Sequence, residues 1–289
     1  MTNKNKVSKR IIEQFLFPSV TLNRTKLQKT VTGKTIVITG ASYGIGEQLA
    51  LLFSTYNVKL ILIARTAEKL NAIADIVKEN GSLCNIIVAD FYQETETERA
   101  IKELFTLTDT IDIFISNAGK SIMRSLENSL TRYHDFTRTN SLNYLAPVNL
   151  ILATTPLIKA TKGQIINISA INVLLLPAPK WAAYQASKTA FDQWFRCNLT
   201  EWKIMKIQAK TIYLPLVNTK MIAPNEKYKN FPAMQPEQAA FRIAKLIYSS
   251  KSYDKPWWLL FLQTSSFFGK YIWEKISFLY LKKQNEKSI

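Results

Sequence analysis

The sequence predicts an α/β fold in which a doubly wound parallel sheet forms a single domain. From Lys34 onward, short runs rich in β-branched residues alternate with segments that have helical spacing. Such alternation is typical of parallel strands covered by helices on both faces. The chain has 289 residues, 47% of them hydrophobic, which is enough to bury one sizeable core. We therefore expect one domain at residues 33–255, a basic N-terminal extension at 1–32 and an amphipathic, aromatic-rich C-terminal tail at 256–289.

Each predicted strand is a short apolar run, and each predicted helix has apolar residues every three to four positions. The first strand, KTIVITG, leads into the helical pattern GIGEQLALLFSTY. The helix after the second strand opens at Thr66, a residue type that commonly caps helices. In chain order, the expected strands are 34–40, 58–64, 83–90, 111–119, 163–169 and 207–215, and the expected helices are 44–56, 66–80, 93–107, 129–157 and 181–202.

The turn after the first strand reads TGASYGIG, residues 39–46, and contains Gly40, Gly44 and Gly46. Glycine is needed where a side chain would keep the backbone away from a cofactor phosphate, and the following helix start offers free N–H groups and a favourable dipole. The turn lies after a strand and before a helix, where dinucleotide-binding proteins place it. This position predicts a Rossmann-type nucleotide site.

The end of the second predicted strand bears on the choice of nicotinamide cofactor. Enzymes that prefer NAD usually place an acid there, against the ribose 2′-hydroxyl. This chain has Ala64 followed by Arg65, and an arginine can pair with a 2′-phosphate through charge-assisted hydrogen bonds. We therefore expect NADPH or NADP as the cofactor, although a surface arginine at the start of the next helix is the alternative.

Tyr184 and Lys188 are the candidate proton-transfer pair. They are four residues apart within a predicted helix, so they share one face of it. An unperturbed tyrosine has a pKa of about 10, and an adjacent ammonium stabilises the phenolate and lowers that pKa. We therefore expect Tyr184 to act as a general acid toward a carbonyl oxygen that receives a hydride at its carbon.

These motifs resemble those of the short-chain dehydrogenases/reductases. The resemblance covers roughly residues 33–250 and includes TGASYGIG, the turn Asn117-Ala118-Gly119 and YQASK. The stretch PLVNTKMIAP and its surroundings are similar to the bacterial fatty acyl-CoA reductases of the short-chain type. The resemblance implies an enzyme of lipid metabolism, an oxidoreductase that reduces a long-chain carbonyl or an acyl-CoA thioester with NADPH.

The resemblance also implies roles for individual residues. Asp90 would contact adenine, Lys188 would hold the nicotinamide ribose hydroxyls, and Asn143 would hold a water that relays protons. The segment from Pro215 to Thr219 would lie along the nicotinamide and pyrophosphate. The expected cofactor-binding residues are Thr39, Gly40, Ser42, Tyr43, Gly44, Ile45, Gly46, Arg65, Asp90, Asn117, Ala118, Gly119, Tyr184, Lys188, Pro215, Val217 and Thr219. The segment that follows contains Met221, Ile222, Tyr228, Phe231 and Met234, which suit an acyl chain and suit ordinary loop packing as well.

The catalytic hydroxyl raises a question of register. Relatives commonly have two serines where this chain has Ser169-Ala170, and the second of them binds the substrate carbonyl. Alanine cannot donate a hydrogen bond, and adjacent strand residues point to opposite faces. The segment from Ala170 to Tyr184 is one residue longer than the commoner spacing, so a bulge or a shift of register by one residue would bring Ser169 into the site. We therefore predict a catalytic set of Asn143, Ser169, Tyr184 and Lys188. The alternative is a serine that faces away and bonds within the structure.

Two features of the composition exclude other kinds of site. His134 is the only histidine, so neither a histidine-rich metal site nor a Ser-His-Asp triad fits within one chain, and we interpret it as a polar residue on a helix. Cys84 and Cys197 belong to no C-x-x-C pair, so nothing indicates a disulfide framework. We expect no metal and a cytoplasmic, reducing compartment.

The net charge of +17 is concentrated toward the ends of the chain. Residues 1–34 carry eight Lys and Arg against Glu13 alone, and residues 249–289 carry seven Lys against three acids. No recognisable nucleic-acid-binding module accompanies this charge, so no nucleic-acid partner is expected. The charged ends suit an anionic membrane surface, and solvated lysines explain them equally well. The apolar part of the first 22 residues is interrupted by Glu13 and Pro18, which makes a poor secretory signal.

The C-terminal tail is rich in aromatic residues, and its unbroken apolar part is too short to span a bilayer. Read as a helix from about Ser265, it is amphipathic, with a polar stripe opposite Phe268, Ile272 and Ile276. Such a surface suits a membrane interface on the inner face of the cell membrane, contact with its own domain, or pairing of two subunits. We expect peripheral membrane contact and a homo-oligomer. The competing function is a non-catalytic or weakly catalytic NADP(H)-binding protein associated with the membrane.

Overall fold

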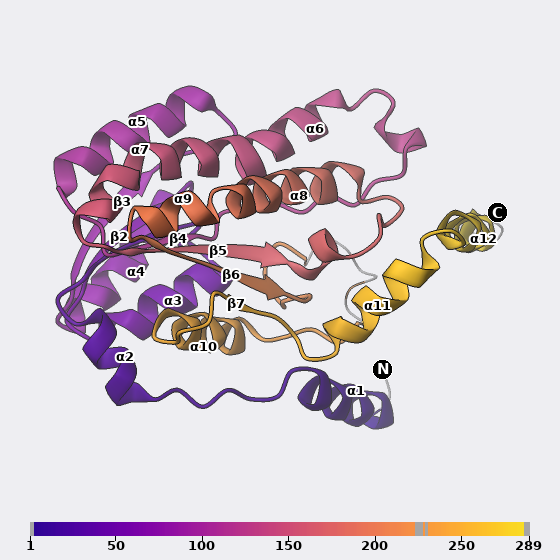
Figure 1. Ribbon diagram of the computed structural model, residues 1–289, viewed down its shortest axis with the longest axis horizontal. Coiled ribbons are helices and arrows are strands. Elements are labelled where there is room, and N and C mark those ends of the chain that lie inside the picture. Colours follow the sequence, from indigo (N-terminus) through magenta and orange to yellow (C-terminus); the bar gives the residue numbers. More distant parts are fainter. Residues whose placement is uncertain (1–2, 223–227, 229–230, 286–289) are drawn as a thin grey trace.

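The computed structural model describes residues 3–222, 228 and 231–285, and its centre is a parallel sheet (Figure 1). The strand order is β3-β2-β1-β4-β5-β6-β7, so the sheet grows outward in both directions from β1 and β4. Every strand pair is parallel. The predicted Rossmann-type, doubly wound sheet is therefore confirmed. The strands are β1 (Thr35–Thr39), β2 (Lys59–Ala64), β3 (Leu83–Val88), β4 (Ile113–Ser116), β5 (Gln164–Ala170), β6 (Gln208–Leu214) and β7 (Tyr253–Asp254).

Helices cover both faces of the sheet (Figure 1). One face packs on α2 (Arg24–Val31), α3 (Gly44–Ser54), α4 (Ala67–Glu79) and α10 (Pro236–Ile247). The other packs on α5 (Glu94–Leu107), α7 (Ala146–Ala160), α8 (Ala182–Cys197) and α9 (Leu199–Ile204). Each strand contributes side chains to both cores, because successive side chains point to opposite faces of the sheet. In β1, Ile36 and Ile38 lie in the first core and Val37 lies in the second.

The helix expected at 129–157 is not continuous. A 3₁₀ turn, η1 (Glu127–Ser129), precedes α6 (Tyr133–Asn140), a π-helical turn η2 (Ser141–Leu145) follows, and α7 completes the run. A π-helical turn holds one more residue than an α-helical turn and often occurs at functional sites. The expected cap also differs, because Thr66 occupies the N-cap position of α4 without a side-chain cap hydrogen bond.

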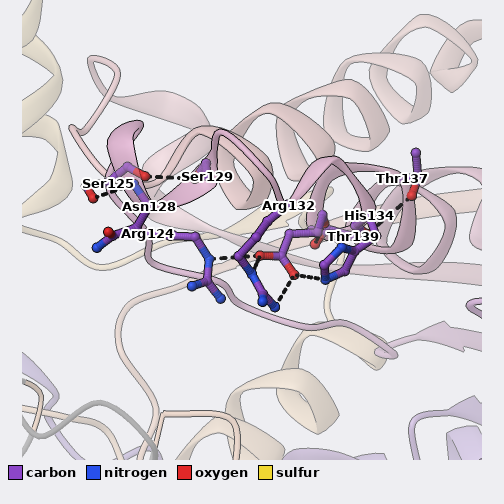
Figure 2. A network of polar contacts seen from close by, with 9 residues as sticks. Arg124, Ser125, Asn128, Ser129, Arg132, His134, Thr137 and Thr139 are labelled. Carbon is purple, nitrogen blue, oxygen red and sulfur yellow. Dashed lines mark hydrogen bonds and ion pairs between the residues drawn. The ribbon is translucent and has the colours of Figure 1, made fainter.

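The loop before α6 is held by one carboxylate. This is the carboxylate of Asp135, and Figure 2 shows Arg124, Arg132 and His134 pointing toward it. Its Oδ2 lies 2.8 Å from Arg124 Nε and 3.0 Å from Arg132 Nε. The hydrogen bond from Arg132 and the nearby positive charges hold the pKa of Asp135 below its usual value. Arg124 N also donates to Lys180 O, 2.8 Å away. The network thus joins the segment after β4 to the segment before α8, and His134 is, as expected, a polar residue on a helix.

The end of α1 lies beside the start of the C-terminal tail (Figure 1). The N-terminal helix α1 (Asn3–Leu16) meets the segment before α11 (Leu259–Gly269), and α12 (Trp273–Asn285) follows. Phe15 and Trp257 make an edge-to-face contact with ring centroids 5.2 Å apart, and Trp258 Nε1 donates to Leu16 O at 3.1 Å. The tail is therefore two helices rather than one that begins at Ser265. The domain boundaries at 33 and 255 stay a prediction, and α2 contributes Leu27 and Val31 to the core.

Candidate active site

The carboxyl ends of β5 and β6 and the start of α8 enclose a cavity of about 290 Å³. Ligands of open α/β sheets bind at this edge, outside the carboxyl ends of the strands. The structure brings Ser169, Tyr184 and Lys188 together in its wall. Most of the surface inside is apolar. The walls also include Ile45, Asn117, Gly119, Ala170, Trp181, Pro215, Val217, Thr219, Met221, Ile222 and Tyr228.

Burial, rather than the neighbouring lysine, dominates the acidity of Tyr184. Burial, with a smaller contribution from the nearby Tyr228, raises the pKa of Tyr184 to about 12. The expected lowering by Lys188 is therefore wrong for the protein in this state. Burial also lowers the pKa of Lys188 to about 8, while the charge of Asp192 opposes that shift. At neutral pH Tyr184 is a protonated phenol and Lys188 is mostly an ammonium, so the cavity holds a proton donor.

Lys188 is fixed from two sides. Its Nζ donates to Ile168 O at the end of β5, 3.2 Å away. Gly119 lies against it, since a Cβ on that glycine would be 3.5 Å from Nζ and 3.3 Å from Asn143 Oδ1. The glycine thus lets the loop after β4 approach the side chains of Lys188 and Asn143, two of the predicted catalytic residues.

Asn143 lies in the π-helical turn and is 1% exposed. Its Nδ2 donates to Lys120 O and to Ser187 Oγ, both at 3.0 Å, and its Oδ1 accepts from Lys120 N at 2.9 Å. The side chain therefore joins the loop after β4 to α8, one residue before Lys188. The expected role of Asn143 in holding a water stays a prediction.

Ser169 lines the cavity and is hydrogen-bonded beneath it. Its Oγ donates to Asp192 Oδ1 at 3.0 Å, and Tyr213 Oη donates to Asp192 Oδ2 at 3.5 Å. Burial raises the pKa of Asp192, against the lowering effects of these hydrogen bonds and of Arg196. Asp192 was not among the predicted residues. Its spacing of four from Lys188 on the same helix is the sequence signal that marks it.

The glycine turn builds a site suited to a dinucleotide phosphate. Gly40 and Gly44 have φ of +66° and +61°, which favour glycine. A Cβ on Gly46 would lie 2.3 Å from Gly40 O, so this glycine allows α3 to pack against the turn. Helix α3 begins at Gly44, and Tyr43 at its N-cap makes no side-chain cap hydrogen bond. The first N–H groups of α3 therefore fit an anionic ligand.

Two of the expected cofactor residues hold the turn together. Thr39 Oγ1 accepts hydrogen bonds from Asn117 N at 2.9 Å and Ala118 N at 3.0 Å. Asn117 Nδ2 donates back to Thr39 O at 2.9 Å and Gly40 O at 3.0 Å. These bonds tie the β1 and β4 turns into one rigid edge. Ser42, also expected here, is buried in the same turn.

Arg65 lies at the end of β2 and is mostly exposed. Its guanidinium is 3.9 Å from the Asp90 carboxylate and 5.5 Å from the centre of the Tyr92 ring. Lys220 Nζ lies 4.3 Å from the centre of the Tyr43 ring, beside the start of α3. Sequence reasoning missed Lys220, although it directly follows the expected cofactor segment. The edge therefore carries two cations near a predicted phosphate position.

Sequence reasoning also missed Asn172, which lines the cavity from the turn η3 (Ile171–Leu174) after β5. Its Oδ1 is buried and has no hydrogen-bond partner among the residues that the structure describes. Gln185 holds this segment, because its Nε2 donates to Asn172 O at 2.7 Å and its Oε1 accepts from Ala178 N at 2.8 Å. The extra residue between Ala170 and Tyr184 was the available signal.

The predicted acyl-chain segment divides between two environments. Met221, Ile222 and Tyr228 line the cavity, whereas Met234 is 1% exposed and packs in the core beside Val217. For Met234 the structure therefore favours ordinary packing, the second of the two interpretations. Phe231 lines a neighbouring cavity.

No group of three or more metal-ligating side chains occurs within the described part of the chain. One helical stretch there, Tyr133–Ala160, is long and apolar enough to cross a membrane by length and composition alone. It includes α7, whose Leu150, Ile151 and Ile158 are fully or almost fully buried in the second core. Within this stretch, α7 packs in the core of the domain.

Comparison with known proteins places the chain among dehydrogenases. Residues 34–230 match the family model described as short chain dehydrogenase. The chain is 40% identical to a fatty acyl-CoA reductase of Acinetobacter baylyi over 221 residues, 76% of this chain and 75% of that protein. It is 36% identical to a fatty acyl-CoA reductase of Mycobacterium tuberculosis over 225 residues, 77% of this chain and 76% of that protein.

Two solved structures share the fold. A short-chain type dehydrogenase/reductase from Mycobacterium marinum has a TM-score of 0.71 at 20% identity and covers 80% of this chain and 96% of its own. An alcohol dehydrogenase from the archaeon Thermococcus sibiricus, complexed with 5-hydroxy-NADP, has a TM-score of 0.67 at 22% identity. The match covers 77% of this chain and 94% of that protein.

Proposed function

This chain belongs to the short-chain dehydrogenase/reductase family, and from that premise we propose that it uses NADPH to reduce a long-chain, lipid-like carbonyl or acyl thioester. The observation that carries the proposal is Tyr184, a half-buried, protonated phenol in a mostly apolar cavity beside the glycine turn. Two relatives above 35% identity are named fatty acyl-CoA reductases, which supports a long acyl substrate.

The predicted catalytic residues divide the work around a carbonyl. A bound nicotinamide cofactor would supply the hydride to the carbonyl carbon. Tyr184 gives its phenolic proton to the carbonyl oxygen, and the Lys188 ammonium stabilises the phenolate that remains. An aldehyde or ketone becomes an alcohol in this step. A thioester becomes a hemithioacetal. This intermediate loses its O–H proton as the C–S bond breaks, and the sulfur takes up a proton, giving an aldehyde and a free thiol.

An NADPH-oxidation assay tests the reaction class. The purified protein is given acyl-CoAs, fatty aldehydes and ketones of graded length, and consumption of NADPH with formation of the reduced product is measured. Turnover that increases with chain length supports the proposal. Tight cofactor binding without turnover of any substrate supports the second candidate, a non-catalytic NADP(H)-binding protein, which the absence of a hydroxyl at Ala170 favours.

We expect Arg65→Ala to remove the preference for NADPH over NADH. The residues that would hold the cofactor are the glycine turn, the start of α3, Asp90 and Arg65. A charge-assisted hydrogen bond contributes about 1.5–3 kcal/mol, so the Kd for NADPH should rise about 10- to 100-fold while that for NADH changes little. Titration of cofactor fluorescence measures both constants. Equal affinities in the unaltered protein, or an unchanged preference in Arg65→Ala, contradict the assignment.

We also propose that the two basic ends of the chain rest on an anionic membrane. The end of α1 contacts the segment just before α11 and α12. Large apolar side chains are exposed on the same helices, among them Phe15, Phe261, Phe267, Phe268 and Phe278. Aromatic side chains next to lysines suit the interface of an acidic bilayer. A cytoplasmic location on the inner face of the cell membrane, and a homo-oligomer, stay predictions.

Substitution of Phe267 and Phe268 by aspartate tests the membrane contact. A buried phenylalanine contributes about 1.5–3 kcal/mol, so the double variant should bind phosphatidylglycerol vesicles at least about tenfold more weakly. Co-sedimentation measures the binding. The control is Tyr133→Asp, because Tyr133 is also well exposed but lies on α6. Equal binding by the double variant and the control would mean that the tail is not the anchor.

A further inference from the structure

A second cavity, of about 370 Å³, lies beside the active-site cavity. Its walls come from the segment before α8, from Tyr228 and Phe231, and from helix α12 in the C-terminal tail. Helix α12 contributes Trp273, Ile276, Ser277 and Tyr280. Apolar surface predominates in it, as it does in the first cavity. Together the two volumes fall in the range of pockets that bind small ligands.

The two cavities share a wall. Ala178, Trp181 and Tyr228 line both of them. The Trp181 ring lies 5.7 Å from the Tyr184 ring and 5.8 Å from the Tyr228 ring, measured between centroids. A chain that begins at the Tyr184 hydroxyl and ends in the second cavity would have to pass Trp181 or Tyr228.

A specific contact holds α12 over this second cavity. Trp273 Nε1 donates to Pro177 O at 2.7 Å, across 96 positions of sequence. This bond holds the helix against the loop before α8. Ile276 and Tyr280 line the cavity and are also partly open to solvent, whereas Leu279 is exposed outside it.

We propose that the second cavity binds the far end of the substrate's hydrocarbon chain, so that α12 determines which chain lengths are accepted. This inference rests on the proposed function, because it takes the reacting carbon to lie at Tyr184. Apolar lining favours methylene groups, at about 25 cal/mol for each Å² removed from water. The Tyr228 and Ser277 hydroxyls are buried there and unpaired among the described residues, so the amide-containing arm of an acyl-CoA is the other occupant to test.

The experiment compares Ile276→Trp, which fills the cavity, with Leu279→Trp on the same helix outside it. The kcat/KM is measured with hexanal, hexadecanal, hexanoyl-CoA and palmitoyl-CoA. We expect Ile276→Trp to lower the ratio of long-chain to short-chain kcat/KM at least about tenfold, in both the aldehyde and the thioester series. The control should keep the ratio of the unaltered protein. Ile276→Ala, which enlarges the cavity with less risk to folding, should raise this ratio.

Two results would overturn the inference. One is an unchanged length ratio in both Ile276 variants. The other is a uniform loss with every thioester and none with the aldehydes, which assigns the cavity to the amide-containing arm. If the unaltered protein reduces none of these compounds, the proposed function fails, and calorimetry with dodecanol then decides about the cavity. Weaker dodecanol binding by Ile276→Trp than by Leu279→Trp supports a hydrocarbon site in the second cavity, and equal binding overturns it.

Discussion

Replacing Tyr184 with phenylalanine is expected to reduce kcat by about 10²- to 10⁴-fold, the usual contribution of a positioned general acid. The phenolic proton is the group that the carbonyl oxygen needs, and burial keeps it on the oxygen, since the pKa of Tyr184 is raised to about 12. The phenyl ring retains its contact with Trp181, so folding and the apolar cavity should persist. Steady-state kinetics with NADPH and a responsive fatty aldehyde measure the loss, and cofactor titration checks that NADPH still binds.

Tyr228→Phe is the matched control. Tyr228 lines the same cavity, and its hydroxyl is buried with no partner among the described residues. Removing that hydroxyl costs no hydrogen bond among the described residues and leaves Tyr184 and Lys188 unaltered, so kcat should change far less than in Tyr184→Phe. Comparable losses in the two variants would mean that the cavity, rather than the Tyr184 proton, is being perturbed.

The pH dependence follows from the same pair of groups. Burial lowers the pKa of Lys188 to about 8, so its charge is present below that pH and is lost as the pH rises through it. Tyr184 keeps its proton over the same range because its pKa is raised. A descending limb of kcat/KM near the Lys188 pKa is therefore expected, and it should be absent from Lys188→Arg, whose guanidinium does not deprotonate.

The strands β1 to β6 were predictable because they are almost continuously apolar, whereas the two-residue β7 and the helix α10 were not among the expected elements. In β1, Ile36 and Ile38 enter one core and Val37 the other, a pattern that needs helices on both faces. The π-helical turn around Asn143 was not predictable, since one extra residue in a turn leaves the apolar periodicity nearly intact. The break between α11 and α12 was missed because apolar residues continue on both sides of it.

The candidate site was predictable in its motifs and less so in its environment. Sequence spacing placed Tyr184 and Lys188 on one helix face, and the structure has them in one cavity wall. The direction of the Tyr184 pKa shift was wrong because spacing reveals a neighbouring charge and does not reveal burial. The contact of Trp273 with Pro177 joins parts of the chain that no local pattern relates, so the tail's place beside the cavity needed the structure.

The hydroxyl that assists the carbonyl oxygen is the point where motif and structure must be weighed together. We propose that Ser169 supplies it in place of Ala170, since both residues line the cavity and only the serine is a donor. In the structure Ser169 Oγ donates to Asp192, which directs its proton away from a substrate. A hydroxyl can rotate, so the Ser169 proton can turn from Asp192 toward the carbonyl oxygen when a substrate enters the cavity.

Ser169→Ala should therefore lower kcat by about 100- to 1,000-fold, the usual cost of removing one donor to a developing oxyanion. Ala170→Ser should change kcat little, because Ser169 already donates a hydrogen bond to the carbonyl oxygen. Thermal unfolding of both variants shows whether loss of the bond to Asp192 affects stability instead of the chemical step. Asn172→Leu belongs in the same series, since Asn172 Oδ1 also lies in this wall and is buried without a hydrogen-bond partner among the described residues. If Ala170→Ser raises the rate and Ser169→Ala is silent, the serine is structural, the catalytic set lacks its hydroxyl, and the enzyme relies on Tyr184 and Lys188 alone.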